Sequence, residues 1–167
     1  MPYCLVVGDP IAHSLSPVIH LAAYRELGLN WDFRCQCVRS GMLSAFLAGA
    51  DTQLRGLAVT MPLKPEALQA ATFADGLARV TGAVNTLVPA AGGDWTGFNT
   101  DVRGIVEAFR YGGAANPPSG ASAVIFGSGS TAASSLAAFS ELGMKELTVI
   151  SRTTAQTGAA FLVAQRM

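Results

Sequence analysis

Short apolar runs of strand length alternate with stretches of helix length along almost the whole chain. Expected strands lie at residues 4–8, 31–38, 56–60, 85–90, 94–99, 123–127 and 147–151. Expected helices lie at residues 16–28, 41–49, 62–71, 72–80, 101–112 and 131–142, with one more starting near residue 153. Strand, helix and strand at this spacing are typical of parallel βαβ units, so the sequence predicts an α/β protein with a mostly parallel sheet.

The first expected helix carries its own start and stop signals. Ser16 is placed to cap the helix, Pro17 fits its first turn, and Gly28 follows its last residues. Val18 and Leu21 fall on one apolar stripe that we expect to face the core. These signals predict a helix anchored at the serine.

The segment at 112–122, GGAANPPSGAS, breaks the periodic pattern with Gly, Pro, Ala and Ser. After it, an expected strand leads through the glycine-rich turn of Gly127 and Gly129 into a helix and a second strand, so we expect an N-terminal α/β domain at 1–112 and the start of a Rossmann dinucleotide-binding domain at 113–167. A complete domain of that kind has roughly six strands, whereas two are predicted after residue 122. A sheet of two strands would expose an edge and an apolar face, so we expect either a fragment of a longer protein or a missing part that something else supplies.

Composition narrows the possible partners. Half of the 167 residues are hydrophobic and 13% are charged, while 11 basic residues balance 11 acidic ones. This balance disfavours a nucleic-acid or membrane-surface partner, and no apolar run approaches the roughly 20 residues of a membrane span. The spacing of the three cysteines and two histidines does not match a metal site. We therefore expect the cysteines to be reduced thiols. Because the first residues do not resemble a signal peptide, we expect a cytoplasmic protein.

A glycine-rich turn follows the expected strand at 123–127. Gly127, Gly129 and Ala132 form the pattern G-x-G-x-x-A, in which glycine lets the backbone approach a pyrophosphate at the helix start. Arg152 follows the next strand, at the place where an acidic residue would bind the ribose 2′-OH of NAD. A guanidinium flanked by hydroxyls suits a 2′-phosphate, so NADP(H) is favoured over NAD; the alternative is a solvated arginine. The expected cofactor residues are Gly127, Ser128, Gly129, Ser130, Thr131, Ala132, Ser151, Arg152 and Thr153.

Polar residues follow several of the expected strands in the N-terminal part. They are Ser14, Ser16, Thr60, Lys64, Asn85 and the run Asn99-Thr100-Asp101. Ligands bind beyond the carboxyl ends of strands in open α/β sheets, so these groups could converge on one crevice. The structural alternatives are helix caps at Ser16 and Asp101 and a turn residue at Asn85. Lys64 sits in a first helical turn, where the dipole disfavours a cation, which favours a functional role.

Six segments together resemble the shikimate dehydrogenase family. They are GDPIAHSLSP (8–17), AVTMPLK (58–64), GAVNTL (82–87), GFNTDVRG (97–104), FGSGSTA (126–132) and SRT (151–153). The resemblance implies an NADP-dependent enzyme, monomeric or homodimeric, that interconverts 3-dehydroshikimate and shikimate on the route to chorismate and aromatic amino acids. Methylenetetrahydrofolate dehydrogenase shares the two-domain plan but would not carry HSLSP and NTD.

The resemblance also implies a role for each site residue. Ser14 and Ser16 would bind the substrate carboxylate. Thr60, Asn85 and Asp101 would hold the ring hydroxyls. Lys64 would carry the proton beside the reacting carbonyl and pair with Asp101, so these two are the expected catalytic residues. Ketone reduction needs a proton on oxygen, which an ammonium group can supply.

The chain also departs from the family pattern. Ser130 stands where a glycine is usual in the phosphate turn, and the family's later substrate-binding tyrosine and glutamine have no counterpart. Two alternatives therefore stay open: an enzyme that acts on both quinate and shikimate, and a non-catalytic shikimate-binding or regulatory protein.

Overall fold

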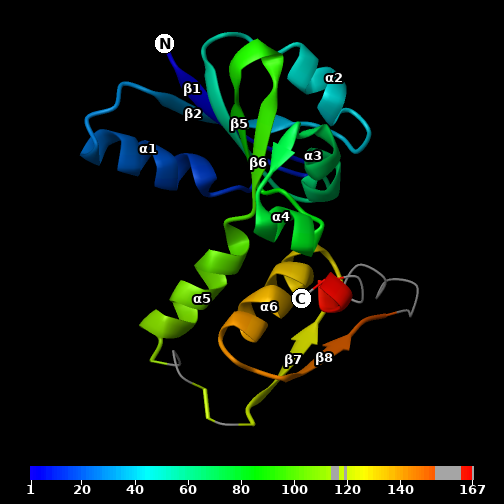
Figure 1. Cartoon of the computed structure of the whole chain (residues 1–167). Coiled ribbons are helices and arrows are strands. Elements are labelled where there is room, and N and C mark those ends of the chain that lie inside the picture. The colour runs from blue at the N-terminus through cyan, green and yellow to red at the C-terminus, as the bar shows by residue number, and fades with distance from the viewer. Residues whose placement is uncertain (114–116, 119, 153–162, 167) are drawn as a thin grey trace. The chain divides into compact units, whose positions relative to one another are not determined.

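The computed structural model describes residues 1–113, 117–118, 120–152 and 163–166. Its elements, labelled in Figure 1, are β1 (Tyr3–Gly8), α1 (Ser16–Glu26), β2 (Asp32–Cys37), α2 (Leu43–Ala48), β3 (Leu54–Val59), α3 (Lys64–Ala70), β4 (Phe73–Ala74), α4 (Gly76–Thr81), β5 (Thr86–Pro89), a 3-10 turn (Ala91–Gly93), β6 (Trp95–Phe98), α5 (Asp101–Tyr111), β7 (Ser122–Phe126), α6 (Ser130–Glu141) and β8 (Glu146–Ile150). The chain forms two compact units, Met1–Ala74 with Val84–Phe98 and Asp75–Ala83 with Asn99–Met167.

The first unit contains a six-stranded sheet in the order β2-β1-β3-β5-β6-β4. β1 pairs in parallel with β2 and β3, and β4 pairs in parallel with β6. β5 runs antiparallel to both of its neighbours, β3 and β6, and the β5–β6 pair is a hairpin closed by the turn at Ala91–Gly93. The α/β class with a mostly parallel sheet is thus confirmed.

One face of this sheet packs against α1. Val6 and Phe33 are 3% exposed and form a cluster with Ile11, and Leu21 and Tyr24 of α1 pack on it. Val18 was expected on the same stripe but is 68% exposed, so that expectation is wrong. The face of α1 that meets the sheet carries Leu21, Tyr24 and His20, whose ring stacks on the Phe33 ring with centroids 4.0 Å apart, and Val18 lies outside this face.

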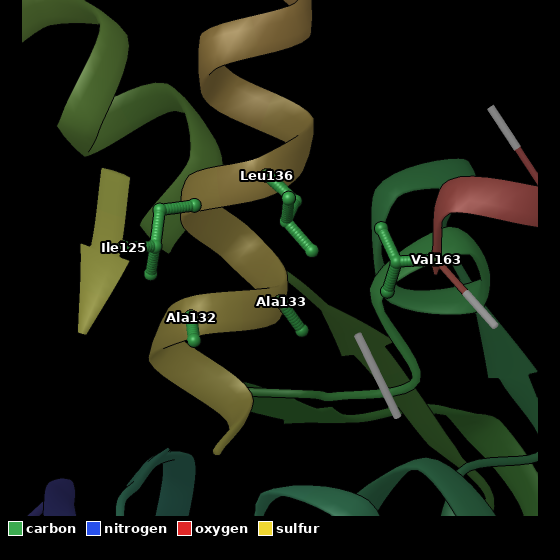
Figure 2. Packing of buried hydrophobic residues seen from close by; sticks show 5 residues of the cluster. All are labelled: Ile125, Ala132, Ala133, Leu136 and Val163. Atoms are coloured by element: carbon green, nitrogen blue, oxygen red, sulfur yellow. The ribbon is translucent and has the colours of Figure 1, made fainter. Parts of the chain in front are cut away.

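The second unit contains a parallel two-stranded sheet, β7–β8, with α6 connecting the strands. Figure 2 shows buried side chains of this unit, with Ile125 on β7 beside Ala132, Ala133 and Leu136 of α6. The other face of the two strands exposes Val124, Phe126 and Ile150 at 53%, 81% and 46%. This exposed apolar face is the one expected of a sheet of two strands.

The compact units do not coincide with the predicted division at 112/113. Val102 and Val106 of α5 are fully buried in a cluster with Ala137 and Ala138 of α6, so α5 lies in the second unit. Burial of this apolar helix face outweighs the break in sequence at 112–122. The domain assignment 1–112 and 113–167 stays a prediction.

Most expected elements are present, with shifts of a few residues at their ends. The helix expected at 72–80 is wrong at its start, because residues 73–74 pair with β6 and α4 begins at Gly76. Asp75 ends the strand and caps the helix by accepting a hydrogen bond from the Ala78 amide at 2.6 Å. The helix expected from residue 153 lies mostly outside the described residues. In the part of the chain that the structure describes, no helix is long and apolar enough to cross a membrane.

Candidate functional site

Two loops of the first unit meet beyond the carboxyl ends of β1 and β3. The Asp9 amide donates to the Met61 carbonyl at 3.1 Å, and the Thr60 amide donates to the Val7 carbonyl at 2.9 Å. A Cβ placed on Gly8 would lie 2.5 Å from the Thr60 Cγ2, so glycine is needed for this approach. The loop that follows β1 and the loop that follows β3 therefore form one surface.

Ser14 lies on the loop after β1 and Ser16 is the first residue of α1, and both are half-buried. The Ser16 amide donates to the Ser14 Oγ at 3.2 Å, which fixes the Ser14 side chain beside the start of α1. The prediction that Ser16 caps α1 is wrong, because Ser16 is the first helical residue and Leu15 stands at the cap without a side-chain bond. The Ser16 hydroxyl is thus not used to close the helix.

Thr60 and Lys64 lie on the loop after β3 and at the start of α3, and both are half-buried. The Leu63 amide donates to the Thr60 carbonyl at 2.9 Å, which closes the turn between the two residues. The Val84 amide donates to the Lys64 carbonyl at 3.0 Å, so the backbone of the lysine is fixed from outside its own helix. The segment that carries Lys64 is therefore tied to the segment that carries Asn85.

Asn85 lies at the start of β5, directly beside the end of β3. Its carbonyl accepts from the Val59 amide at 2.7 Å, its amide donates to the Phe98 carbonyl at 3.0 Å, and its Oδ1 accepts from the Thr86 hydroxyl at 2.9 Å. Because β5 is antiparallel to β3, the beginning of one strand meets the end of the other. Asn85 thus lies at the same sheet edge as Thr60.

Asp101 belongs to the other compact unit, at the first position of α5. It does not cap that helix, because Thr100 stands at the cap position. Asn99 does the capping instead: its Oδ1 accepts from the amides of Asp101 and Val102 at 3.0 and 3.3 Å. The predicted pairing of Asp101 with Lys64 stays a prediction. Asn99 was listed among the polar residues that follow the strands, but the sequence assigned it no role in the site.

Five of the predicted cofactor residues line one hollow of about 680 Å³ in the second unit. They are Gly127, Ser128, Gly129, Ser151 and Arg152, joined by the exposed side chains of Phe126 and Ile150. Gly127 has a φ of +113°, which disfavours any other residue, and its amide donates to the Ile150 carbonyl at 2.8 Å. The glycine turn and the end of β8 therefore face the same space.

The start of α6 completes this hollow. Gly129 stands at the cap position without a side-chain bond, and Ser130 is the first helical residue. Because no side chain caps the helix, its first amides can donate to an anion. A Cβ on Gly127 or Gly129 would meet no atom within 4 Å, so the space beside the turn is open. These features fit a dinucleotide phosphate.

The remaining predicted cofactor residues lie on or beyond this helix. Thr131 is exposed in the first turn of α6, whereas Ala132 is 6% exposed and packs into the core. Ala132 therefore serves close packing of the helix on the strands. Thr153 lies outside the described residues. Within those residues, no group of three or more His, Cys, Asp or Glu side chains could hold a metal ion.

These features define a class: an α/β protein with a glycine-rich turn between a strand and a helix in one unit and a polar sheet edge in the other. Residues 6–87 match the family model described as the shikimate dehydrogenase substrate binding domain. Residues 6–87 therefore belong to the shikimate dehydrogenase substrate-binding domain family, and the chain as a whole is similar to shikimate dehydrogenases.

Known relatives agree with this assignment. Pentafunctional AROM polypeptides of Candida glabrata and Lachancea thermotolerans are each 35% identical over 150 and 148 residues, which is 89% of this chain and 10% and 9% of theirs. Shikimate dehydrogenase of Mycobacterium tuberculosis is 32% identical, with a TM-score of 0.84 over 99% of this chain and 60% of that one. Shikimate 5-dehydrogenase of Thermus thermophilus in complex with NADP(H) and shikimate is 32% identical, with a TM-score of 0.85 over 98% and 61%. The chain thus spans about a tenth of the curated relatives and about 60% of these solved ones.

Proposed function

We propose that this chain acts as an NADP-dependent shikimate dehydrogenase, interconverting 3-dehydroshikimate and shikimate on the route to chorismate and aromatic amino acids. The observation that carries the proposal is the meeting of the Ser14–Ser16 loop, the Thr60–Lys64 turn and Asn85 at one edge of the sheet. The Thermus thermophilus relative, solved with NADP(H) and shikimate, supports both the substrate and the cofactor.

The chemistry of this edge suits a small polyhydroxylated acid. The hydroxyls of Ser14 and Ser16 would donate to its carboxylate. The Thr60 hydroxyl and the Asn85 amide can each donate and accept, which is what ring hydroxyls require. All four side chains are half-buried, so their hydrogen bonds to a ligand would be partly shielded from water.

Lys64 would carry the proton of the reaction. NADPH, when bound, supplies the hydride that goes to the carbonyl carbon of the substrate. The Lys64 ammonium would donate a proton to the carbonyl oxygen, and in the reverse direction the neutral amine would accept it from the hydroxyl. Its positive charge would also stabilise the developing alkoxide. Asp101 would hold a ring hydroxyl and orient the lysine.

The hollow of the second unit would hold the adenosine end of NADP(H). The first amides of α6, after Gly129, would bind the pyrophosphate. Ser151 and Arg152 would bind the 2′-phosphate, because a guanidinium forms strong charge-assisted hydrogen bonds with phosphate oxygens. In the structure both residues line the same hollow as the glycine turn, which supports a single nucleotide site.

We also propose a cytoplasmic protein, monomeric or homodimeric, whose partners are small molecules rather than nucleic acid or membranes. The free thiols of Cys4, Cys35 and Cys37 are compatible with a reducing compartment. The even balance of acidic and basic residues supports the absence of a polyanionic partner.

The test is a measurement of NADP reduction with shikimate and, separately, with quinate, on this chain and on any longer parent chain; turnover in the longer chain alone would show that this chain is a fragment of the enzyme. We expect turnover with shikimate, and a loss of about 100-fold or more in Lys64→Ala. Lys145→Ala changes an exposed lysine next to β8 and is the matched control. Calorimetric titration with shikimate runs in parallel.

Each outcome separates the alternatives. Equal or better turnover with quinate would favour the dual-specificity enzyme. Shikimate binding without turnover would favour the non-catalytic binding protein. If the protein neither bound shikimate nor turned it over, that result would contradict the proposal.

A further inference from the structure

Three polar side chains are buried within the described residues, and they form one network. Asn99 is 2% exposed, Thr81 is 3% exposed and Ser134 is fully buried. The Asn99 Nδ2 donates to the Thr81 Oγ1 at 2.8 Å, to the Ala83 carbonyl at 3.0 Å and to the Ser134 Oγ at 3.1 Å. All of these residues belong to the second compact unit. Burial of a polar group is costly unless it is hydrogen-bonded, so this grouping has a structural purpose.

The orientation of the Asn99 amide is fixed by its backbone partners. Its Oδ1 faces the amides of Asp101 and Val102, which can only donate. Its Nδ2 faces the carbonyl of Ala83, which can only accept. A flipped amide would oppose like groups on both sides, so only one orientation satisfies the network.

The main chain of Asn99 is held as well. Its amide donates to the Asp75 Oδ2 at 3.3 Å, while the Asp75 Oδ1 caps α4. Asn99 therefore joins three helices: α4 through Thr81 and Asp75, the start of α5 through its Oδ1, and α6 through Ser134. Together these bonds to three helices leave the Asn99 side chain little freedom to move.

We propose that Asn99 is the positioning residue of Asp101 and that its bond to Ser134 ties the placement of Asp101 to the cofactor helix α6. The proposal rests on the proposed function, in which Asp101 contacts substrate. The Asp101 amide is held directly by the Asn99 Oδ1 at 3.0 Å, so any tilt of the Asn99 side chain moves the first turn of α5.

Ser134 supplies the link to the cofactor. It lies about one turn after Ser130, where α6 begins beside the glycine turn. A nucleotide that fixes the start of α6 would thereby also steady Asn99 and the first turn of α5. The chain would then couple an occupied cofactor hollow to a correctly placed Asp101.

The first test is hydrogen exchange at the amides of Asp101 and Val102, measured by NMR with β1 amides as internal reference. We expect Ser134→Ala to raise exchange at these two amides about fivefold, since one hydrogen bond that orients their acceptor is lost. Ser135→Ala is the matched control: the Ser135 Oγ donates to the Thr131 carbonyl and does not touch Asn99. Unchanged exchange in Ser134→Ala would overturn the link to α6.

The second test is a double-mutant cycle on kcat. Asn99→Ala and Ser134→Ala should each lower kcat, by about tenfold and about threefold, and neither should lower it further in an Asp101→Asn background. Losses that add to that of Asp101→Asn would show a general structural role and overturn the proposal. Ser134→Ala decides the question if Asn99→Ala does not fold.

The two tests also separate this inference from the proposed function. A wild-type chain without turnover of shikimate would contradict the function, whereas hydrogen exchange would still decide how Asp101 is positioned.

Discussion

Gly8 lies so close to Thr60 that a Cβ on residue 8 would be 2.5 Å from the Thr60 Cγ2 and 2.7 Å from the Met61 carbonyl oxygen. This approach brings the loop after β1 against the loop after β3. The candidate carboxylate-binding serines lie on the first loop and at the start of the helix that follows it, and the candidate proton carrier follows the second loop. The shape of the proposed substrate site thus depends on the absence of one side chain.

Gly8→Ala should therefore lower both stability and substrate binding. The methyl group would push apart two backbone segments, which typically costs about 1–3 kcal/mol of unfolding free energy. Urea unfolding measures the first effect, and calorimetric titration with shikimate measures the second. Gly104→Ala is the control, because its Cβ would meet nothing within 4 Å in the middle of α5. That change should stabilise the protein slightly. Equal stability of Gly8→Ala and wild type would contradict the close approach.

Arg152→Gln should shift the cofactor preference away from NADP. Loss of the guanidinium removes a charge-assisted contact to the 2′-phosphate, and we expect NADP affinity to fall about 10- to 100-fold with little change for NAD. Fluorescence titration with NADPH and NADH measures both affinities. Arg103→Gln is the control: it changes an exposed arginine that pairs with Glu107 on α5, so it should alter neither the NADPH affinity nor the NADH affinity. An equal loss for the two cofactors would assign Arg152 to another part of the nucleotide.

Glu66→Ala should destabilise the first unit more than the same substitution of an exposed glutamate destabilises the protein. The Glu66 carboxylate accepts hydrogen bonds from the amides of Gly41 and Leu43 at 2.9 and 2.7 Å. A side chain of α3 thus supplies acceptors for amides at and just before the start of α2. Loss of a comparable cap costs about 0.5–2 kcal/mol. Glu107→Ala removes exposed ion pairs with Arg103 and Arg110 and should cost less than about 1 kcal/mol. Urea unfolding compares the two, and a reversed order would contradict the prediction.

Stability should fall as the pH rises above roughly 8.5, the ordinary pKa of a thiol. Burial raises the pKa of Cys4, and burial together with the Cys4 thiol raises the pKa of Tyr24. A group whose pKa is higher in the folded than in the unfolded protein contributes fully to the stability of the folded state at a pH below its unfolded pKa. That contribution is lost as the pH rises through the folded pKa. Urea unfolding between pH 7 and pH 10 measures the decline. Cys4→Ala should flatten it, whereas Cys35→Ala, which changes an exposed thiol, should leave it unchanged.

Some features of the fold could be predicted because they depend on neighbours in sequence. Alternating apolar runs predicted the strands and most helices, since a strand or helix buries one face wherever it lies. Val18 and the start of α4 could not be predicted from local pattern. The face of α1 that meets the sheet and the pairing of residues 73–74 with β6 are decided by long-range contacts.

The candidate site divides in the same way. The sequence by itself determined the residue types of the site: the serine, threonine, lysine and asparagine after strands, and the glycine turn before α6. Tertiary structure alone decided that the serine loop, the lysine turn and Asn85 share an edge, and that Asn99 rather than Asp101 closes the start of α5. The physical reason is that hydrogen bonds across strands and helices join residues far apart in the chain, and such partners leave no periodic signal in the sequence.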